Sequence, residues 1–167
     1  MLNENAVYAG SDEMESGKYQ GEWLAEHFKA EGKTDIKYIL LNGMIGQTST
    51  AQRTESCLQA LADAGINAEE ATAPLAADWD RATAQDMITP LVTTIEYDCI
   101  ISNNDAMALG AIEALKAAGI DPSTIPIVGV DAGKALNEGT NFTLDETGNV
   151  LWVPFEPVTI DNVADYM

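Results

Sequence analysis

The amino-acid sequence predicts an α/β fold, a doubly wound, mostly parallel sheet with helices on both faces. Three observations support this prediction. Strand-like apolar runs alternate with helix-like runs along the chain. The helix-like runs carry apolar residues at steps of three and four. Two of them end in the same way, in "ADAGI" and "KAAGI", with Gly65 and Gly119 where a helix commonly turns left-handed.

The expected elements follow one another in strand–helix order. The strands are "AVYAG", "IKYILLNG", "INAEEATAPL", "YDCIIS" and "IPIVGVDA". Helices are expected after the first four, at about residues 14–30, 49–64, 79–94 and 105–119. A strand within "VLWVPFEPV", whose prolines suit an edge or a crossing segment, and a short helix, "DNVADYM", complete the chain.

Small residues predict how these elements pack. Gly17 and Gly21 share a helical stripe with larger apolar residues, and we expect these glycines to allow a close approach to the sheet. Cys57 shares a helical stripe with leucines, and Cys99 lies inside an apolar strand. Neither cysteine has CxxC spacing, so both are expected to be small core residues.

Composition and charge favour one globular unit. With 167 residues, of which 46% are hydrophobic and 21% charged, the chain is expected to form a single lobe over residues 1–167. Residues 1–136 are expected to be contiguous βα units, 137–148 a polar loop, and 149–167 the terminal strand and helix. Eight Lys and Arg against 27 Asp and Glu give a formal net charge of −19, which argues against nucleic-acid binding.

The sequence shows no obvious targeting segment. No apolar stretch reaches the roughly 20 residues that a membrane span needs. The start, "MLNENAVYAG", has neither the basic segment nor the apolar core of a signal peptide. The chain is therefore expected to be either intracellular or a mature or excised part of an exported protein.

Polar and aromatic residues gather in the segments that follow the predicted strands. Because the carboxyl ends of parallel strands meet at one edge of a sheet, these residues are expected to lie together. An aromatic ring can cover the apolar face of a sugar, while carboxylate, amide and guanidinium groups bind neighbouring hydroxyls in pairs. The sequence therefore predicts a sugar site at this edge, with Gln47, Ser49, Arg53, Trp79, Asn104 and Asp131 as its ligand residues. Asn103 and Asp105 lie next to Asn104 in the same segment.

Most of these residues also have a structural interpretation. Asn104 or Asp105 fits the N-cap of the following helix, and only one of them can fill it. Trp79 fits packing at a helix start as well as a stacking platform. Arg53 fits a pair with a nearby carboxylate, and Asp131 fits a helix cap. Their shared edge favours ligand binding over a set of separate structural roles.

No enzymatic site is apparent. The single histidine, His27, lies on a helix away from that edge, and the sequence has no GxSxG, Walker A or GxGxxG motif. Four aspartates have suitable chemistry for Mg²⁺, but no spacing singles them out: Asp78, Asp80, Asp98 and Asp105. We therefore expect a binding protein with no catalytic residues, cofactor or metal.

The run "SNNDAMALGAIEALKAAGI", followed by "IPIVGVDA" and preceded by "AADWD", resembles the periplasmic sugar-binding proteins, especially their galactose/glucose-binding members. "YAGSDEMESGKYQGEWLAEHF" resembles the segment that opens the family's carboxyl-terminal lobe, and "VLWVPFEPVTIDN" resembles its final strand. The resemblance implies that lobe alone of a two-lobed type I periplasmic-binding-protein fold. It also implies a role in ABC-type sugar uptake or chemosensing, in the periplasm or another extracytoplasmic compartment.

The resemblance assigns roles to the matching positions. Trp79 matches the tryptophan that stacks on the sugar ring in this family. Arg53 matches the arginine that bridges ring substituents. Asn104 and Asp131 match the asparagine and aspartate that bind adjacent hydroxyls.

Three features depart from the family pattern. Gln47 and Ser49 stand where the family has a histidine and an aspartate; both form hydrogen bonds, but the charge lost at Ser49 leaves the preferred sugar open. The family's calcium loop has no counterpart, because "EGKTDIK" is short and poor in oxygen ligands, although Glu96 takes the place of the distant glutamate ligand. A polar loop also replaces a strand and helix that cross to the first lobe.

The resemblance also implies partners. They are a monosaccharide, an amino-terminal lobe that closes over it by a hinge, and an ABC permease or chemoreceptor. With one wall only, the chain is expected to bind hexoses at millimolar strength or below detection, and its uncovered edge favours self-association. The alternative is the effector-binding domain of a LacI-type transcription regulator, which shares the fold; the acidic balance and the short start argue against it.

Overall fold

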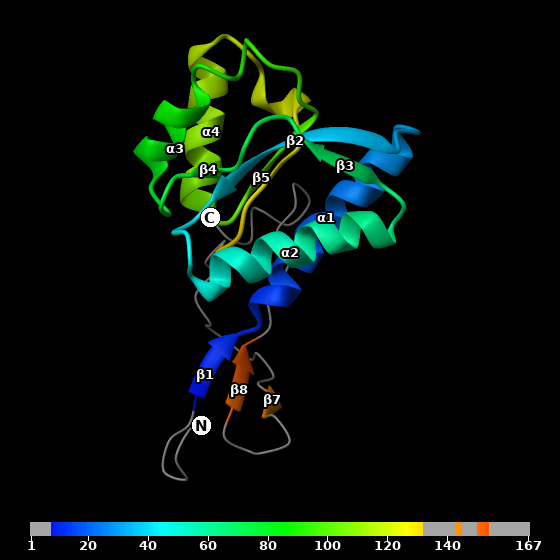
Figure 1. Cartoon of the computed structure of the whole chain (residues 1–167), viewed down its shortest axis with the longest axis vertical. Coiled ribbons are helices and arrows are strands. Elements are labelled where there is room, and N and C mark those ends of the chain that lie inside the picture. Colours follow the sequence, from blue (N-terminus) through cyan, green and yellow to red (C-terminus); the bar gives the residue numbers. More distant parts are fainter. Residues whose placement is uncertain (1–7, 132–142, 145–149, 154–167) are drawn as a thin grey trace.

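The structure is a computed structural model that describes residues 8–131, 143–144 and 150–153. Its main sheet has five strands in the order β3-β2-β5-β6, with β4 beside the end of β2, and every pairing is parallel. The strands are β2 (Asp35–Asn42), β3 (Asn67–Glu70), β4 (Leu75–Ala76), β5 (Cys99–Ser102) and β6 (Ile127–Val128). The helices are α1 (Glu13–Ala30), α2 (Thr48–Asp63), α3 (Arg81–Ile88) and α4 (Asp105–Ala117), and a 3-10 turn spans Pro122–Thr124. The predicted α/β class is confirmed (Figure 1).

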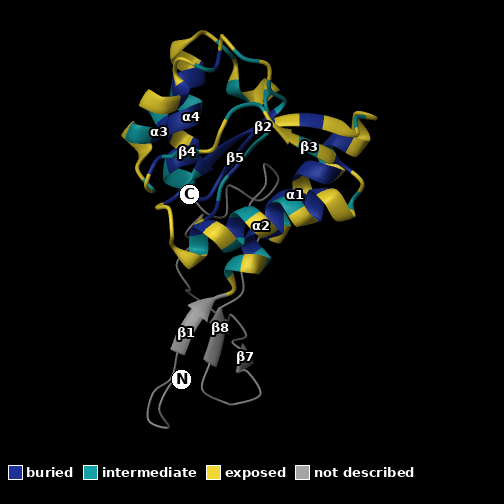
Figure 2. Cartoon of the chain, viewed as in Figure 1, coloured by how far each residue is buried: buried dark blue, intermediate teal, exposed yellow. Residues whose placement is uncertain are grey.

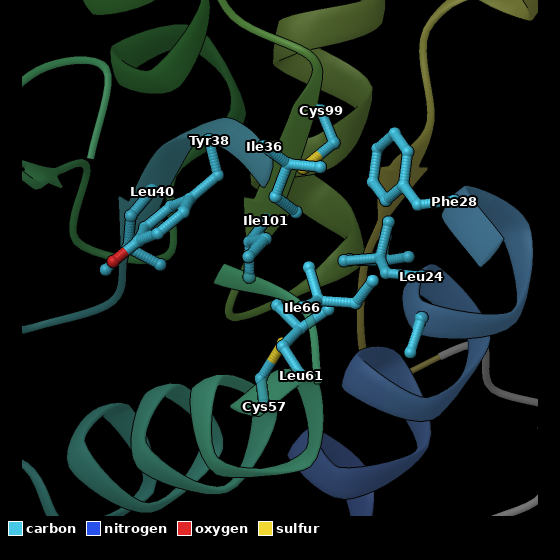
Figure 3. Packing of buried hydrophobic residues seen from close by; sticks show 12 residues of the cluster. Leu24, Phe28, Ile36, Tyr38, Leu40, Cys57, Leu61, Ile66, Cys99 and Ile101 are labelled. Carbon is cyan, nitrogen blue, oxygen red and sulfur yellow. The ribbon is translucent and has the colours of Figure 1, made fainter. Parts of the chain in front are cut away.

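Alternation along β2 sorts the core into two layers. One face of the strand carries Ile36, Tyr38 and Leu40 toward α1 and α2. They belong to one buried cluster with Leu24 of α1 and Leu61 of α2, whose side chains are drawn in Figure 3. Each fully buried Leu or Ile contributes roughly 1.5–3 kcal/mol to folding, so this cluster supplies much of the stability of that half.

The other face of the main sheet packs on α3 and α4. There, Ile39 and Leu41 of β2 and Ile100 of β5 contact a stripe on the two helices. That stripe consists of Ala84, Ile88, Met107, Ala111, Ala114 and Leu115. The molecule therefore has helix, sheet and helix layers, with buried residues on both faces of the sheet (Figure 2).

The glycines of α1 approach a helix rather than the sheet, which corrects the sequence expectation. A Cβ added at Gly17 would lie 2.1 Å from the carbonyl oxygen of Arg53, and one at Gly21 would lie 2.3 Å from that of Cys57. Both neighbours belong to α2. The four residues do form one stripe on α1, but a helical stripe can contact two neighbouring elements. Here Leu24 and Phe28 pack in the cluster that includes the sheet residues, while the glycines contact α2.

Helix ends follow local chemistry. Gly65 and Gly119 have φ values of +80° and +75°, which confirms the predicted left-handed turns after α2 and α4. The third helix is shorter than expected, because Asp80 caps its start by accepting from the Thr83 N–H at 2.8 Å. Pro90, which has no N–H, follows its last residues and suits its end. Trp79 therefore lies before α3 rather than inside it.

The first strand belongs to a second sheet, which also differs from the expectation. In it β1 (Tyr8–Ser11) pairs in parallel with β8 (Val150–Val153), and β7 (Thr143–Leu144) pairs antiparallel with β8. Figure 1 shows these strands extending away from the helix layers. Strand β7 lies within the segment expected to be a polar loop. The expected helix "DNVADYM" lies outside the described residues.

The cysteines confirm one further expectation. Cys57 and Cys99 are both free and fully buried in the layer between the sheet and helices α1 and α2. Burial raises the pKa of both thiols, which keeps them protonated at neutral pH. In the described part of the chain, no helix combines the length and apolar character needed to cross a bilayer.

Candidate functional site

The segments that follow the main-sheet strands form one connected group of side chains. Hydrogen bonds and ion pairs join Arg53 of α2 to the residues after β5 and β6. Contacts also join Trp79, after β4, to Arg53 and to Gln47, after β2. The structure thus brings together residues that are far apart in the sequence at the edge that the sequence predicts.

Arg53 is the centre of this group and is only 7% exposed. Its Nε donates to the carboxylate of Glu13, at the first residue of α1. Its Nη1 donates to the carbonyl oxygen of Asn103 at 2.6 Å, and its Nη2 lies 3.2 Å from Oδ1 of Asp131. All three nitrogens of the guanidinium group are therefore engaged, which fixes its plane.

The Trp79 indole is fixed from three directions. Its Nε1–H donates to Oε1 of Gln47 at 2.8 Å. Its ring centroid lies 5.6 Å from Cζ of Arg53, within the range of a cation–π contact. A Cβ added at Gly43 would lie 2.2–2.4 Å from three atoms of the ring, so the indole packs directly on the Gly43 backbone. The absence of a side chain at Gly43 is thus what allows the ring to lie at this edge.

Backbone strain is concentrated at the same edge. Three described residues other than glycine have positive φ: Asp78 at 52°, Trp79 at 67° and Asp131 at 96°. The left-handed region costs a residue with a Cβ about 1–2 kcal/mol. Such strain persists where the surrounding structure over-determines it, and it occurs most often at functional sites. Two of the three strained residues are predicted ligand residues.

The three polar residues after β5 have separate roles. Asn104 is the N-cap of α4, because its Oδ1 accepts from the Met107 N–H at 3.0 Å. Its Nδ2 lies 3.4 Å from the Trp79 carbonyl oxygen, so the cap also contacts the segment that carries the indole. Asn103 is fully buried and braces β2 and α2, and Asp105 begins α4. The alternative that the sequence leaves open is thereby settled in favour of Asn104 as the cap.

Asp105 and Asp131 are two carboxyl groups beside one guanidinium. The Asp105 N–H donates to the Val130 carbonyl oxygen at 2.7 Å, which holds the residue against the segment that carries Asp131. Burial is the main reason that the pKa of Asp105 is raised to about 6, the negative charge of Asp131 adds to it, and Arg53 opposes it. Burial likewise raises the pKa of Asp131, while Arg53 lowers it. The site therefore gains negative charge as the pH rises through 6.

Asp105 gives a first testable prediction. Because its pKa is higher in the folded than in the unfolded chain, the folded state binds this proton more tightly, and stability should fall as the pH rises from about 4 through about 6. Asp105→Asn should remove this fall and be more stable than the wild type at pH 7.5 by about 1 kcal/mol, a value reduced for solvent access. Urea unfolding at pH 4.5 and 7.5 measures both.

An exposed carboxylate serves as the control. Asp86 lies on the outer face of α3, away from the Arg53 group, so Asp86→Asn should leave the pH dependence unchanged. An equal stability difference between the wild type and Asp105→Asn at both pH values would contradict the prediction.

Gln47 and Ser49 contribute differently. Gln47 is the N-cap residue of α2, yet its side chain makes no cap hydrogen bond and instead accepts from the Trp79 indole. Ser49 lies in the first turn of α2 and is half-buried. Its side chain makes no hydrogen bond to any described residue, and it is not linked to the Arg53 group by any contact found there. Gln47 is thus part of the connected group, whereas Ser49 lies on the same helix turn without a contact to it.

Three supporting residues were not among the predicted ligand residues. Glu13, Gly43 and Asn103 contact Arg53 or Trp79, or hold the loops that carry them. Glu13 in "SDEMESG" has the pattern of an acidic residue in a first helical turn, which is common at helix starts. Only the tertiary structure shows that its carboxylate reaches across to α2.

Two hollows lie elsewhere on the described part of the chain. One, of about 670 Å³, lies at the amino ends of β2 and β3 between residues such as Lys37 and Tyr97. The other, of about 720 Å³, lies between α1 and α2 near Glu15 and Gln59. Neither of these two hollows is lined by a predicted ligand residue. Glu96 is 93% exposed and pairs with Lys37, and no described residues form a cluster of three or more potential metal ligands.

Comparisons with known proteins agree with this arrangement. The family described as "Periplasmic binding protein domain" matches residues 3–140. The D-galactose/methyl-galactoside binding periplasmic protein of Haemophilus influenzae is 30% identical over 98% of this chain and 62% of its own length. An ABC transporter solute binding protein from Bacillus halodurans, with bound myo-inositol, has a TM-score of 0.71 and 25% identity over 96% of this chain and 62% of its own.

Two further matches also cover only part of the matched protein. A periplasmic solute binding protein from Actinobacillus succinogenes with bound D-allose has a TM-score of 0.64 and 28% identity, and covers 75% of this chain and 42% of its own. The transcriptional regulator GalR of Escherichia coli is 31% identical over 66% of this chain and is a weaker match. This chain thus spans less than two thirds of the length of these relatives.

Proposed function

Because the chain belongs to the family described as "Periplasmic binding protein domain", we propose that it is a non-catalytic lobe that binds a hexose or a related cyclic polyol for an ABC-type uptake or chemosensing system. The observation that carries the proposal is the connected group of Arg53, Trp79 and Asp131 at the carboxyl edge of the main sheet. In open α/β sheets, ligands bind at this edge. The ligands named for the galactoside-binding and inositol-bound relatives support this class.

Each side chain has a role that its environment supports. The open part of the Trp79 ring would cover the apolar C–H face of a pyranose or cyclitol. Asp131, whose side chain is 51% exposed, would accept hydrogen bonds from neighbouring hydroxyls. Asn104 has an amide N–H beyond the one that contacts Trp79, and Arg53 has N–H groups beyond those already bonded. Gln47 and Ser49 would bind at the rim.

The affinity of the isolated chain is expected to be low, because a single lobe covers only one side of a ligand. Each hydrogen bond formed beside solvent contributes about 0.5–1.5 kcal/mol. A few such bonds and one stacking contact must also offset an association cost of at least ~4 kcal/mol. A dissociation constant near 1 mM, equivalent to about −4 kcal/mol, is therefore the expected upper limit of binding strength. In this proposal, a second lobe encloses the ligand in the full-length protein.

Trp79 provides the direct test of this function. In a background with Trp23→Phe and Trp152→Phe, Trp79 is the single remaining tryptophan of the three. Galactose, glucose or myo-inositol should then shift or quench its fluorescence at millimolar concentration, because the ring becomes covered on one face. Trp79→Ala in a separate titration calorimetry experiment should abolish binding, whereas Trp23→Ala, on the exposed face of α1, should not.

Two outcomes would count against the proposal. Undiminished binding by Trp79→Ala would show that the indole is not the platform. Micromolar binding by a protein shown to be monomeric by sedimentation would mean that the pocket is closed, contrary to the single wall proposed. Binding of sugars together with DNA would instead favour the regulator alternative, which the weaker GalR match represents.

A further inference from the structure

The charges around Arg53 are not balanced. Its guanidinium group is paired with Glu13 at Nε and with Asp131 at Nη2, and Asp105 lies beside the segment that carries Asp131. Arg81, the first residue of α3, pairs with Glu113 of α4 instead. One positive charge therefore faces up to three negative charges, so the described site is acidic.

Glu13 differs from the other two carboxylates in its position. It is the first residue of α1, where the partial positive charge of the helix terminus favours a carboxylate. Its side chain is 27% exposed, and the Arg53 side chain that it contacts is 9% exposed, so solvent screens this pair less than a surface pair. It contacts Arg53 at Nε, on the side of the guanidinium group away from the Asn103 carbonyl contact.

Glu13 also prevents Arg53 from binding a ligand carboxylate through two parallel hydrogen bonds. A carboxylate ligand binds arginine most strongly through two parallel N–H···O bonds. In this chain Nε is bonded to Glu13, Nη1 to the Asn103 carbonyl oxygen and Nη2 to Asp131. No pair of nitrogens is therefore free of a protein acceptor, so a ligand carboxylate would have to compete with Glu13 and Asp131 for the guanidinium group.

We propose that Glu13 is a specificity-determining residue that makes this site accept neutral and amine-bearing sugars and exclude acidic ones such as uronates. This inference rests on the proposed sugar-binding function. A hydroxyl can donate to Asp131, and a protonated amine gains from the excess of carboxylates, whereas a ligand carboxylate is repelled by them. Glu13 acts through Arg53 and need not touch the ligand, so it is a positioning residue.

The test compares three ligands that share one ring. Glucose, glucosamine and glucuronate are neutral, cationic and anionic, and each is titrated while the Trp79 indole N–H signal is followed by NMR. The wild type should bind glucosamine at least as well as glucose and glucuronate at least tenfold more weakly. Glu13→Gln should change the glucuronate-to-glucose ratio at least fivefold in favour of glucuronate, and added salt should reduce the discrimination of the wild type.

Two matched variants separate charge from structure. Glu15→Gln removes a neighbouring carboxylate of α1 that accepts from Tyr19 rather than Arg53, and it should behave as the wild type. Glu13→Asp keeps the charge with a shorter side chain and should retain the discrimination, which a purely structural role would not predict. A wild type that binds glucuronate as well as glucose, or an unchanged ratio in Glu13→Gln, would overturn the inference.

A measurement without sugar distinguishes failure of this inference from failure of the proposed function. Glu13 is one of the charges that raise the pKa of Asp131, together with the larger effect of burial and against Arg53. Titration of the Asp131 carboxyl carbon by NMR should therefore show a lower pKa in Glu13→Gln than in the wild type. If no sugar binds but this shift is seen, the proposed function fails and the charge-setting role of Glu13 stands; an unshifted pKa would overturn that role.

Discussion

Arg53→Met is expected to lower the free energy of unfolding by about 3 kcal/mol and to abolish ligand binding. The change leaves Glu13 and Asp131 without their cation and the Asn103 carbonyl oxygen without a donor. Removing one partner of a buried pair costs about 3–5 kcal/mol, and the partial exposure of both carboxylates places this case at the low end. For a chain of this length, the loss corresponds to a fall in Tm of roughly 6–12 °C.

Arg81→Met is the matched control for this prediction. Arg81 also pairs with a glutamate, Glu113, but its side chain is 49% exposed, so its loss should cost less than about 1 kcal/mol. Adding Glu13→Gln to Arg53→Met should recover part of the lost stability, because it removes an uncompensated charge. Equal decreases in the free energy of unfolding for Arg53→Met and Arg81→Met, measured with urea, would show that the Arg53 contacts do not stabilise the chain more than an exposed ion pair does.

The sequence predicts the main sheet well because its signals are local. The apolar run "IKYILL" predicts a strand buried on both faces, and the structure places alternate residues of β2 in the two helix layers. The left-handed turns at Gly65 and Gly119 also depend only on neighbouring residues. Strand ends then lie at one edge because parallel strands share a direction, which is why the site could be placed at all.

The errors concern long-range choices. A short apolar strand before a helix has the same pattern whichever sheet it joins, so nothing near Tyr8 indicates its pairing with Val150. The stripe on α1 likewise does not show that Gly17 faces α2. Trp79 was expected at a helix start, but it lies before α3 with a positive φ and contacts Gly43 and Gln47, which are distant in the sequence.

The candidate site shows the same division. Arg53, Trp79, Asn104, Asp131 and Gln47 belong to one connected set of contacts, and their roles toward a ligand stay predictions. Residues that act on these side chains were missed, because a buried amide or a first-turn carboxylate has an ordinary helix-cap pattern in the sequence. The clearest case is Asn103, the first asparagine of "SNND".

Asn103→Leu is expected to destabilise the chain by about 2–4 kcal/mol and to weaken ligand binding without any direct contact to the ligand. The Asn103 side chain is 0% exposed; its Oδ1 accepts from the Gly43 N–H at 3.0 Å, and its Nδ2 donates to Oγ1 of Thr54 at 3.0 Å. Leucine has a similar volume but leaves the Gly43 N–H buried without a partner, and each such group costs about 1–3 kcal/mol. Because Gly43 supports the Trp79 ring, the indole should also lose its fixed position. Urea unfolding and the fluorescence of Trp79 measure the two effects.

Asn104→Ala separates this brace from ordinary capping, because it removes the N-cap of α4 and the 3.4 Å contact to the Trp79 carbonyl oxygen but leaves the Asn103 hydrogen bonds, and it should cost about 1 kcal/mol. A double-mutant cycle with Thr54→Val then tests the contact itself. Thr54 also donates to Asn42 at 3.3 Å, so its loss alone disturbs the same buried network. Since both variants remove one shared hydrogen bond, their combined cost should be less than the sum by at least about 0.5 kcal/mol. Additive costs, or a loss in Asn103→Leu no larger than that in Asn104→Ala, would show that Asn103 only fills space between β2 and α2. The expected coupling would instead make the first asparagine of "NND" the residue that ties the strand-end loops into one ligand-facing wall.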